Sequence, residues 1–221
     1  MHGGPGAVWN APRVPHPLRR AALLLVGCVV LGIGVAMLLT ADLGSDGFST
    51  LVNGLAKAVD TPFVVANTGV SVVFLLAAAA RGLRPGIGTL VQVVLVGSVV
   101  SLLLPPLDVP ASVLGQVLLL AAAFPVIALG IVCYLGAHLG AGPAESPALA
   151  WDPPVPFRWS YSAIQLGGAV GGWLLGATIG PGTLAVILLL GPFVDLTSRL
   201  LRIDLRQDAA IDLAPDDVVQ P

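Results

Sequence analysis

The feature that most constrains the fold is an apolar run at residues 21–40, which ends in a short polar break. About 20 apolar residues rising 1.5 Å each cover the roughly 30 Å hydrocarbon core of a bilayer, so the run predicts a transmembrane helix. Residues 46–59 then show apolar side chains at helical spacing, but a helix of this length reaches only about 21 Å. We therefore expect a re-entrant or interfacial segment behind the first span. The polar break between them holds Asp42, Gly44, Asp46 and Gly47.

Composition extends this interpretation to the whole chain. Apolar residues make up 56% of it and charged residues only 10%, whereas a soluble domain carries roughly 25% charged residues. The sequence therefore predicts an integral membrane protein with the lipid bilayer as partner, and the net charge of −2 argues against nucleic acid. Cys28 and Cys133 lie inside apolar runs without metal spacing, so we expect neither a metal nor another cofactor.

Five further apolar stretches complete a predicted set of six transmembrane helices, at residues 62–80, 87–104, 112–136, 158–178 and 183–201. The chain then divides into a disordered basic tail, a first three-span repeat, a connecting loop, a second three-span repeat and an acidic cytoplasmic tail, at 1–20, 21–104, 105–111, 112–202 and 203–221. This threading places Lys57 outside and the arginines in the cytoplasm. The positive-inside rule therefore predicts a multi-pass protein of the inner cell membrane with both termini cytoplasmic.

Two repeated sequence motifs indicate that the six spans divide into two similar halves. His138 lies 96 residues after Asp42 in a second polar break, and the turn at 180–184 repeats the Gly-x-Gly-Thr-Leu turn at 86–90 after 94 residues. Three spans are an odd number, so the second half enters from the opposite side, as in the inverted repeats of transporters. Five prolines between residues 143 and 156 predict that the second short helix is broken or only one turn long.

The same motifs carry a family resemblance. Ala41-Asp42-Leu43-Gly44 after a glycine-rich span, the two Gly-x-Gly-Thr-Leu turns, and Gly191-Pro192 with Asp195 in the last span resemble the bacterial YczE/YyaS-type membrane proteins. The resemblance covers roughly residues 20–202. It implies a fold and a membrane location but no reaction, although some members of that family are labelled permease-like.

Polar residues in or beside the spans are the candidates for a solute or ion path. Each has a structural alternative: Asp46 can cap the helix that follows, Asp195 can pair with Arg199 one turn later, and the amides can join helices by hydrogen bonds. Asp42 and His138 can simply lie in the membrane interface. The candidates are Asp42, Asp46, Asn67, His138, Gln165 and Asp195.

Small residues four apart on the fifth span predict close helix packing, either inside the protein or in a homodimer. Trp151, Trp159 and Tyr161 precede or begin this span and predict an interfacial aromatic belt. The packing glycines are Gly167, Gly168, Gly171, Gly172 and Gly176.

The sequence contains no enzyme signature, so we expect no enzyme. The leading hypothesis is a small-solute permease or exporter-like carrier for an unknown solute or ion, with its route between the repeats. The alternative is a non-transporting partner or regulator of another membrane component, docking through the glycine face or the acidic tail. A membrane-embedded enzyme would need convergent titratable groups, which the sequence does not predict.

Overall fold

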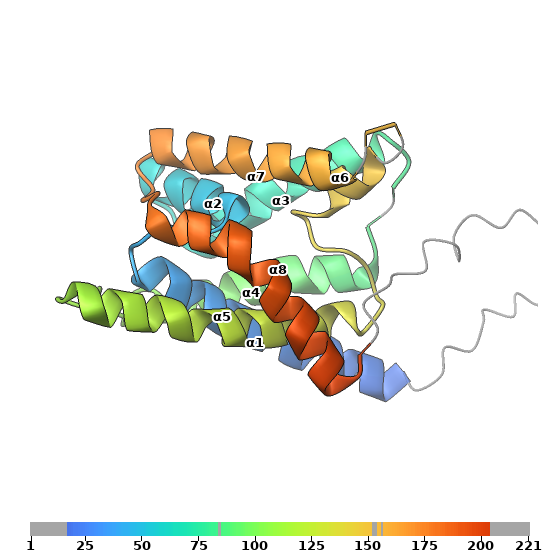
Figure 1. Ribbon diagram of the computed structural model, residues 1–221. Coiled ribbons are helices and arrows are strands. Elements are labelled where there is room, and N and C mark those ends of the chain that lie inside the picture. The colour runs from blue at the N-terminus through green and yellow to red at the C-terminus, as the bar shows by residue number, and fades with distance from the viewer. Residues whose placement is uncertain (1–16, 84, 152–153, 156, 204–221) are drawn as a thin grey trace, which may run out of the picture.

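The computed structural model describes residues 17–83, 85–151, 154–155 and 157–203. The predicted tails lie outside these ranges, except that residues 17–20, predicted as disordered, belong to the first helix and that Ile203 is described. This part of the chain holds eight helices and no strand (Figure 1). The helices are α1 Pro17–Thr40, α2 Gly47–Ala58, α3 Phe63–Ala79, α4 Ile87–Leu103, α5 Val113–Leu135, α6 Ser146–Ala150, α7 Phe157–Leu174 and α8 Pro181–Leu201.

Three of these helices, α1, α5 and α8, are long and apolar enough to cross a membrane, and α3 and α4 are shorter apolar helices. Many large apolar side chains lie on the outside of the bundle, such as Leu184, Leu188 and Leu200 on α8. Such a surface is unfavourable in water but favourable against lipid chains. The structure therefore indicates a helical membrane protein.

The helices form two groups (Figure 1). In one group α1 packs against α5 and α4, and α5 also contacts α8. In the other group α2 packs against α7 and α3, and α6 bridges α3 and α7. Contacts between α3 and α4 join the groups, and α8 crosses obliquely from one to the other.

Contacts between distant segments define the two ends of the bundle. At the first, which we call the Arg20 end, Arg20 Nε donates to Ala137 O at 2.6 Å, and Ile203 lies against Gly136. At the opposite end, the Leu43 end, Gly182 N donates to Leu43 O at 2.8 Å. Because α1 starts where α5 finishes, these two helices are antiparallel. The start of α1 and the end of α8 lie at the same end of the bundle (Figure 1).

The two polar breaks make equivalent contacts in the two halves of the chain. Gly182 N donates to Leu43 O at 2.8 Å, and Gly88 N donates to Leu139 O at 2.9 Å. Each glycine belongs to the Gly-x-Gly-Thr turn of the other half. The backbone follows the same path in both breaks, with positive φ angles at Asp42 (52°), Gly44 (98°), His138 (50°) and Gly140 (133°).

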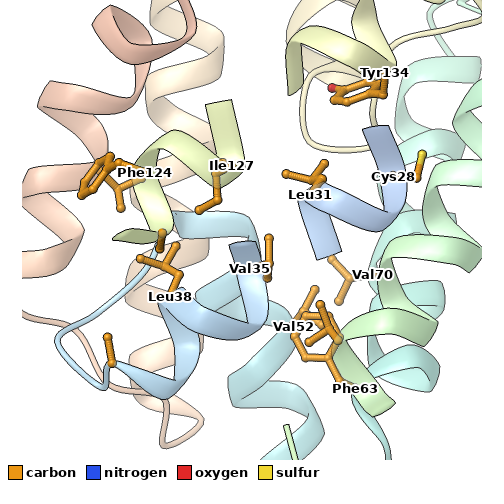
Figure 2. Close-up of a cluster of buried hydrophobic side chains, with 14 of the residues drawn as sticks. Cys28, Leu31, Val35, Leu38, Val52, Phe63, Val70, Phe124, Ile127 and Tyr134 are labelled. Atoms are coloured by element: carbon orange, nitrogen blue, oxygen red, sulfur yellow. The ribbon is translucent and has the colours of Figure 1, made fainter. Parts of the chain in front are cut away.

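The crossing of α1 and α5 repeats this exchange. A Cβ atom at Gly34 would lie 2.5 Å from the Ile127 side chain, and one at Gly130 would lie 2.5 Å from the Leu31 backbone. Both glycines therefore permit a helix approach that a larger residue would prevent. Leu31 and Ile127 lie among the buried side chains at this crossing, together with Cys28 and Val35 (Figure 2).

Helix α2 fills only one half of the bundle's length. Its first residue, Gly47, lies against the backbone of Gln165 in the middle of α7, and Thr50 lies against Gly172 near the end of α7. The chain therefore turns inward after Leu43, starts α2 at mid-height and returns toward the Leu43 end. Of the two predicted alternatives, this path favours the re-entrant one over an interfacial helix.

The second break contains a much shorter helix. The five residues of α6 amount to little more than one turn, as the prolines around it predict. Beside it, the Arg81 guanidinium lies 5.2 Å from the centre of the Trp151 ring, a cation–π contact between the ends of α3 and α6.

Candidate functional site

A cavity of about 100 Å³ lies between the two helix groups. Its wall includes residues from α1, α2, α3, α4, α5, α7 and α8, and from the second break just before α6. Its volume is about two thirds of the roughly 150 Å³ of an apolar cavity that accommodates benzene. The polar residues of the wall are Asp46, Ser49, Asn67, Gln92, Tyr134, Glu145, Tyr161 and Gln165.

Asp46 reaches the cavity because it caps the short helix α2. Its backbone is extended, and its Oδ2 accepts a hydrogen bond from Ser49 N at 2.9 Å, as an N-cap does. Gln165 completes this helix start from α7: its Oε1 accepts from Phe48 N at 3.1 Å and its Nε2 donates to Tyr161 Oη at 2.8 Å. The carboxyl group of Asp46 is thereby held at the middle of the bundle.

Glu145, the single glutamate of the chain, brings a second carboxyl group to the cavity from the other break. It directly precedes α6, as Asp46 precedes α2. Gly142 leaves space for this side chain. A Cβ atom at Gly142 would lie 2.8 Å from Gln92 Oε1 and would clash with Glu145 Oε2. Two acceptor oxygens from different segments therefore flank the same glycine.

Three buried polar atoms at this wall, Gln92 Oε1, Tyr134 Oη and Glu145 Oε2, complete no hydrogen bond within the described part of the chain. The Tyr134 hydroxyl and the Glu145 carboxyl are neighbours. In Figure 2 the Tyr134 hydroxyl is directed away from Cys28. An unsatisfied buried polar group costs about 1–3 kcal/mol, so water or a ligand in the cavity is needed to complete the hydrogen bonds of these atoms.

The two carboxyl groups influence each other. Burial raises the pKa of Asp46 above its ordinary value, and hydrogen bonds from Ser49 offset part of this effect. Burial likewise raises the pKa of Glu145, and the negative charge of Asp46 raises it further. Both residues lie outside the long helices, at the starts of α2 and α6. The site therefore binds protons more readily than exposed carboxylates do.

Of the six predicted path residues, the structure brings Asp46, Asn67 and Gln165 together at the cavity. Asn67 is buried between α3 and α4, where its Nδ2 donates to Val93 O at 2.8 Å. The amides of Asn67 and Gln165 thus join helices and also line the cavity.

Asp42, His138 and Asp195 lie elsewhere, and all three are exposed. Asp42 Oδ1 accepts a hydrogen bond from Thr178 Oγ1 at 2.5 Å beside a separate hollow of about 10 Å³. The carbonyl oxygen of His138 accepts from the Arg20 guanidinium at the Arg20 end. Asp42 and His138 occupy equivalent positions in the two breaks. They share a positive φ angle but not a common side-chain environment.

The five predicted packing glycines have different surroundings. Gly168 and Gly172 face α2, where added Cβ atoms would lie 2.5 Å from Gly47 O and 2.2 Å from Thr50 O. At Gly171 a Cβ would meet Leu51 at 3.3 Å, whereas Gly167 has open space around it. Gly176 has a φ of 91° just beyond the end of α7, where it terminates the helix.

Sequence reasoning missed the role of Glu145 and of two tyrosines. Tyr161 lines the cavity instead of joining an interfacial belt, whereas Trp151 and Trp159 are exposed as such a belt requires. The signal for Glu145 was present: it is the only glutamate, and it lies in a break that repeats the one containing Asp46. The offset of 96 residues aligns Glu145 with Ser49 rather than with Asp46, which hid the correspondence.

Apolar helices around a buried cavity with two carboxyl groups indicate the class of a helical membrane protein. The chain belongs to a family of unknown function, DUF6198, whose profile matches residues 18–199. It is similar to an uncharacterized protein of Haemophilus influenzae, with 23% identity over 185 residues that cover 81% of this chain and 85% of the relative. No solved structure matches the chain. The resemblance to YczE/YyaS-type proteins stays a prediction.

Proposed function

We propose that the protein is a small-solute carrier, a permease or exporter, whose solute passes between the two helix groups through the cavity. One observation carries this proposal: Asp46 and Glu145, which start the short helices of the two breaks, face the same buried cavity. Ionisable residues inside a membrane protein are costly and mark solute, ion or proton paths. Interrupted helices that meet near the middle of a bundle are a recurrent way to build such a site.

The carrier works as two inverted repeats in this proposal. The exchange of contacts between Leu43 and Gly182, and between Leu139 and Gly88, supports it, because a two-fold axis between the halves would produce both. The antiparallel crossing of α1 and α5 would lie on that axis. Rocking of one helix group against the other would then open the cavity toward alternate sides.

Six helices cross the membrane in this arrangement, namely α1, α3, α4, α5, α7 and α8. The Arg20 end carries Arg19, Arg20 and Arg81, and it is assigned to the cytoplasm by the positive-inside rule. Lys57 lies near the opposite end, close to the end of α2. In this proposal the protein lies in the inner membrane with both termini in the cytoplasm.

The raised pKa values of Asp46 and Glu145 support coupling of the solute to protons. A carboxyl group whose pKa is raised can release its proton when a solute binds and rebind it when the solute leaves. Docking of a partner through the glycine face loses support, because Gly168 and Gly172 are occupied by α2. The acidic tail, the other predicted docking segment, lies outside the described residues except for Ile203.

The test uses proteoliposomes that contain the full-length protein and an internal pH-sensitive dye. An imposed pH gradient is followed while a panel of small cations, anions and neutral solutes is added outside. We expect at least one solute to dissipate the pH gradient in vesicles that contain the wild type. Vesicles with Asp46→Asn or Glu145→Gln should keep the gradient when the same solute is added. Vesicles with Asp42→Asn, the same chemical change outside the cavity, should lose it as the wild type does. If no solute moves protons, or if all three variants behave alike, the proposal fails.

A further inference from the structure

The unpaired atoms of the cavity wall restrict the chemistry of its ligand. We infer that the cavity binds a small organic cation that donates N–H hydrogen bonds, that is, a guanidinium or primary ammonium group with few additional heavy atoms. This inference names the substrate class of the carrier proposed above, and it rests on that proposed function.

The polar groups that lack partners are mainly acceptors. Gln92 Oε1 and Glu145 Oε2 can only accept hydrogen bonds when Glu145 is ionised, and Tyr134 Oη can accept as well as donate. Gln92 is only 9% exposed and Tyr134 only 2% exposed, so bulk water does not satisfy them. One amide N–H of Gln165 and one of Asn67 are already used within the protein. A ligand with several N–H donors therefore forms the most hydrogen bonds with this wall.

Charge favours the same ligand. Asp46 and Glu145 place two carboxyl groups at one cavity, and no Lys, Arg or His lies at its described wall. A cation would compensate the repulsion between the two carboxylates, whereas an anion would add to it. The aromatic rings of Phe48, Phe63 and Tyr161 supply additional surface that a cation can contact through its face.

Size excludes larger cations. A volume of about 100 Å³ is smaller than the roughly 150 Å³ that accommodates benzene, so a ligand of up to about five heavy atoms fits. Guanidinium and methylammonium meet this limit. A multi-ring cation would need the cavity to expand.

Four probes separate charge from hydrogen bonding. The full-length protein in nanodiscs is titrated with guanidinium, methylammonium, tetramethylammonium and urea at constant ionic strength, and binding is followed by calorimetry and by thermal stability. Urea keeps the shape and N–H groups of guanidinium without its charge, whereas tetramethylammonium keeps the charge without N–H groups. We expect saturable binding of guanidinium or methylammonium, and binding of urea and tetramethylammonium weaker by about tenfold or more.

Matched variants locate the site. Glu145→Gln and Asp46→Asn should weaken binding by about tenfold or more, because each removes a charged acceptor. Tyr134→Phe should weaken it by roughly threefold, the effect of a modest neutral hydrogen bond, because it removes the hydroxyl beside the Glu145 carboxyl group. Asp195→Asn, on the exposed face of α8, should leave the affinity within about twofold.

The outcomes separate this inference from the proposed function. Absence of saturable guanidinium and methylammonium binding, equal binding of tetramethylammonium, or undiminished binding in both carboxyl variants would overturn the inference. If another solute then releases the pH gradient in proteoliposomes, the carrier proposal survives without it. Binding of guanidinium that depends on Glu145, without any flux, would support the site and contradict the carrier.

Discussion

Gly182 N donates a hydrogen bond of 2.8 Å to Leu43 O, which joins the start of α8 to the break behind α1. The equivalent bond of 2.9 Å joins Gly88 N to Leu139 O. Each break is thus fixed by a glycine turn of the other half of the chain. Because Asp46 and Glu145 follow these anchored positions within a few residues, the same contacts position both carboxyl groups of the cavity.

A series of glycine-to-alanine variants tests this anchoring. Gly44 has a φ of 98°, and a Cβ there would lie 2.4 Å from Thr183 Oγ1 and 2.7 Å from Gly180 N. Backbone strain and overpacking together should reduce the free energy of unfolding by about 2–5 kcal/mol. The midpoint of thermal unfolding in detergent measures the effect.

Two other glycines provide the controls for Gly44→Ala. Gly82 has a φ of 90° but open space around it, so Gly82→Ala should cost only the backbone strain, about 1–2 kcal/mol. Gly69 lies within α3 with open space, so Gly69→Ala should be neutral or stabilise by up to about 1 kcal/mol. Equal effects at Gly44 and Gly82 would mean that the contact with the second half contributes nothing.

The contact between α2 and α7 gives a second prediction. Gly172→Ala should destabilise the protein by about 1–3 kcal/mol, because the new methyl group would lie 2.2 Å from Thr50 O and force the helices apart. Gly167→Ala, on the same helix with open space around it, should be neutral or slightly stabilising. The midpoints of thermal unfolding of both variants are measured in one detergent. A lower midpoint for Gly167→Ala than for Gly172→Ala would contradict the packing of α2 against Gly172.

The carboxyl groups of the cavity predict how stability changes with pH. The pKa values of Asp46 and Glu145 are raised in the folded state above the unfolded values of about 4. The folded protein therefore binds more protons in the interval between the two, and stability falls as pH rises through it. We expect the midpoint of thermal unfolding to decrease from about pH 4 upward, until both groups are ionised.

The double variant Asp46→Asn, Glu145→Gln is the matched experiment for this pH dependence. Its unfolding midpoint should change less with pH than that of the wild type, because the two groups that change protonation are absent. No histidine, lysine or arginine lies at the described wall of the cavity, so the variant removes the two carboxyl groups without leaving another such group there. A pH profile identical to that of the wild type would show that neither carboxyl group is perturbed.

Much of the helical architecture was predictable because apolar runs of membrane length leave few alternatives. The described helices lie close to the six predicted spans, and Asp46 caps α2 as its position before an amphipathic segment suggests. Helix ends shifted by several residues at α1 and α7, where no strong capping residue marks the boundary. The glycine repeats identified the positions of both breaks and both turns.

The composition of the cavity was only partly predictable. Asp46, Asn67 and Gln165 stood out as polar residues among apolar neighbours, but Asp42 and His138 stood out equally and lie outside. Which face of a break is buried depends on the packing of the other half of the chain, for example on Gly182 against Leu43. Tyr134 and Glu145 meet only after α5 and the second break fold against each other, and no local pattern encodes that contact.

Single cysteines test the membrane arrangement of the carrier. In a background with Cys28→Ala and Cys133→Ala, Lys57→Cys should react with an impermeant thiol reagent added outside cells, and Leu83→Cys should react only in inverted vesicles. The two positions lie near opposite ends of the bundle, in the last turn of α2 and after α3 respectively. Reaction of both from the same side would contradict the six-crossing topology.

The most direct test of the central claim measures whether the cavity is reached from both sides of the membrane. Ser49→Cys and Ala144→Cys, in the same background, place a thiol on the cavity wall from each break with little change in size. The account predicts that a small impermeant cationic thiol reagent labels both positions in intact cells and in inverted vesicles, whereas Lys57→Cys is labelled from one side alone. If neither Ser49→Cys nor Ala144→Cys is labelled in intact cells, or if neither is labelled in inverted vesicles, a solute route between the helix groups is contradicted.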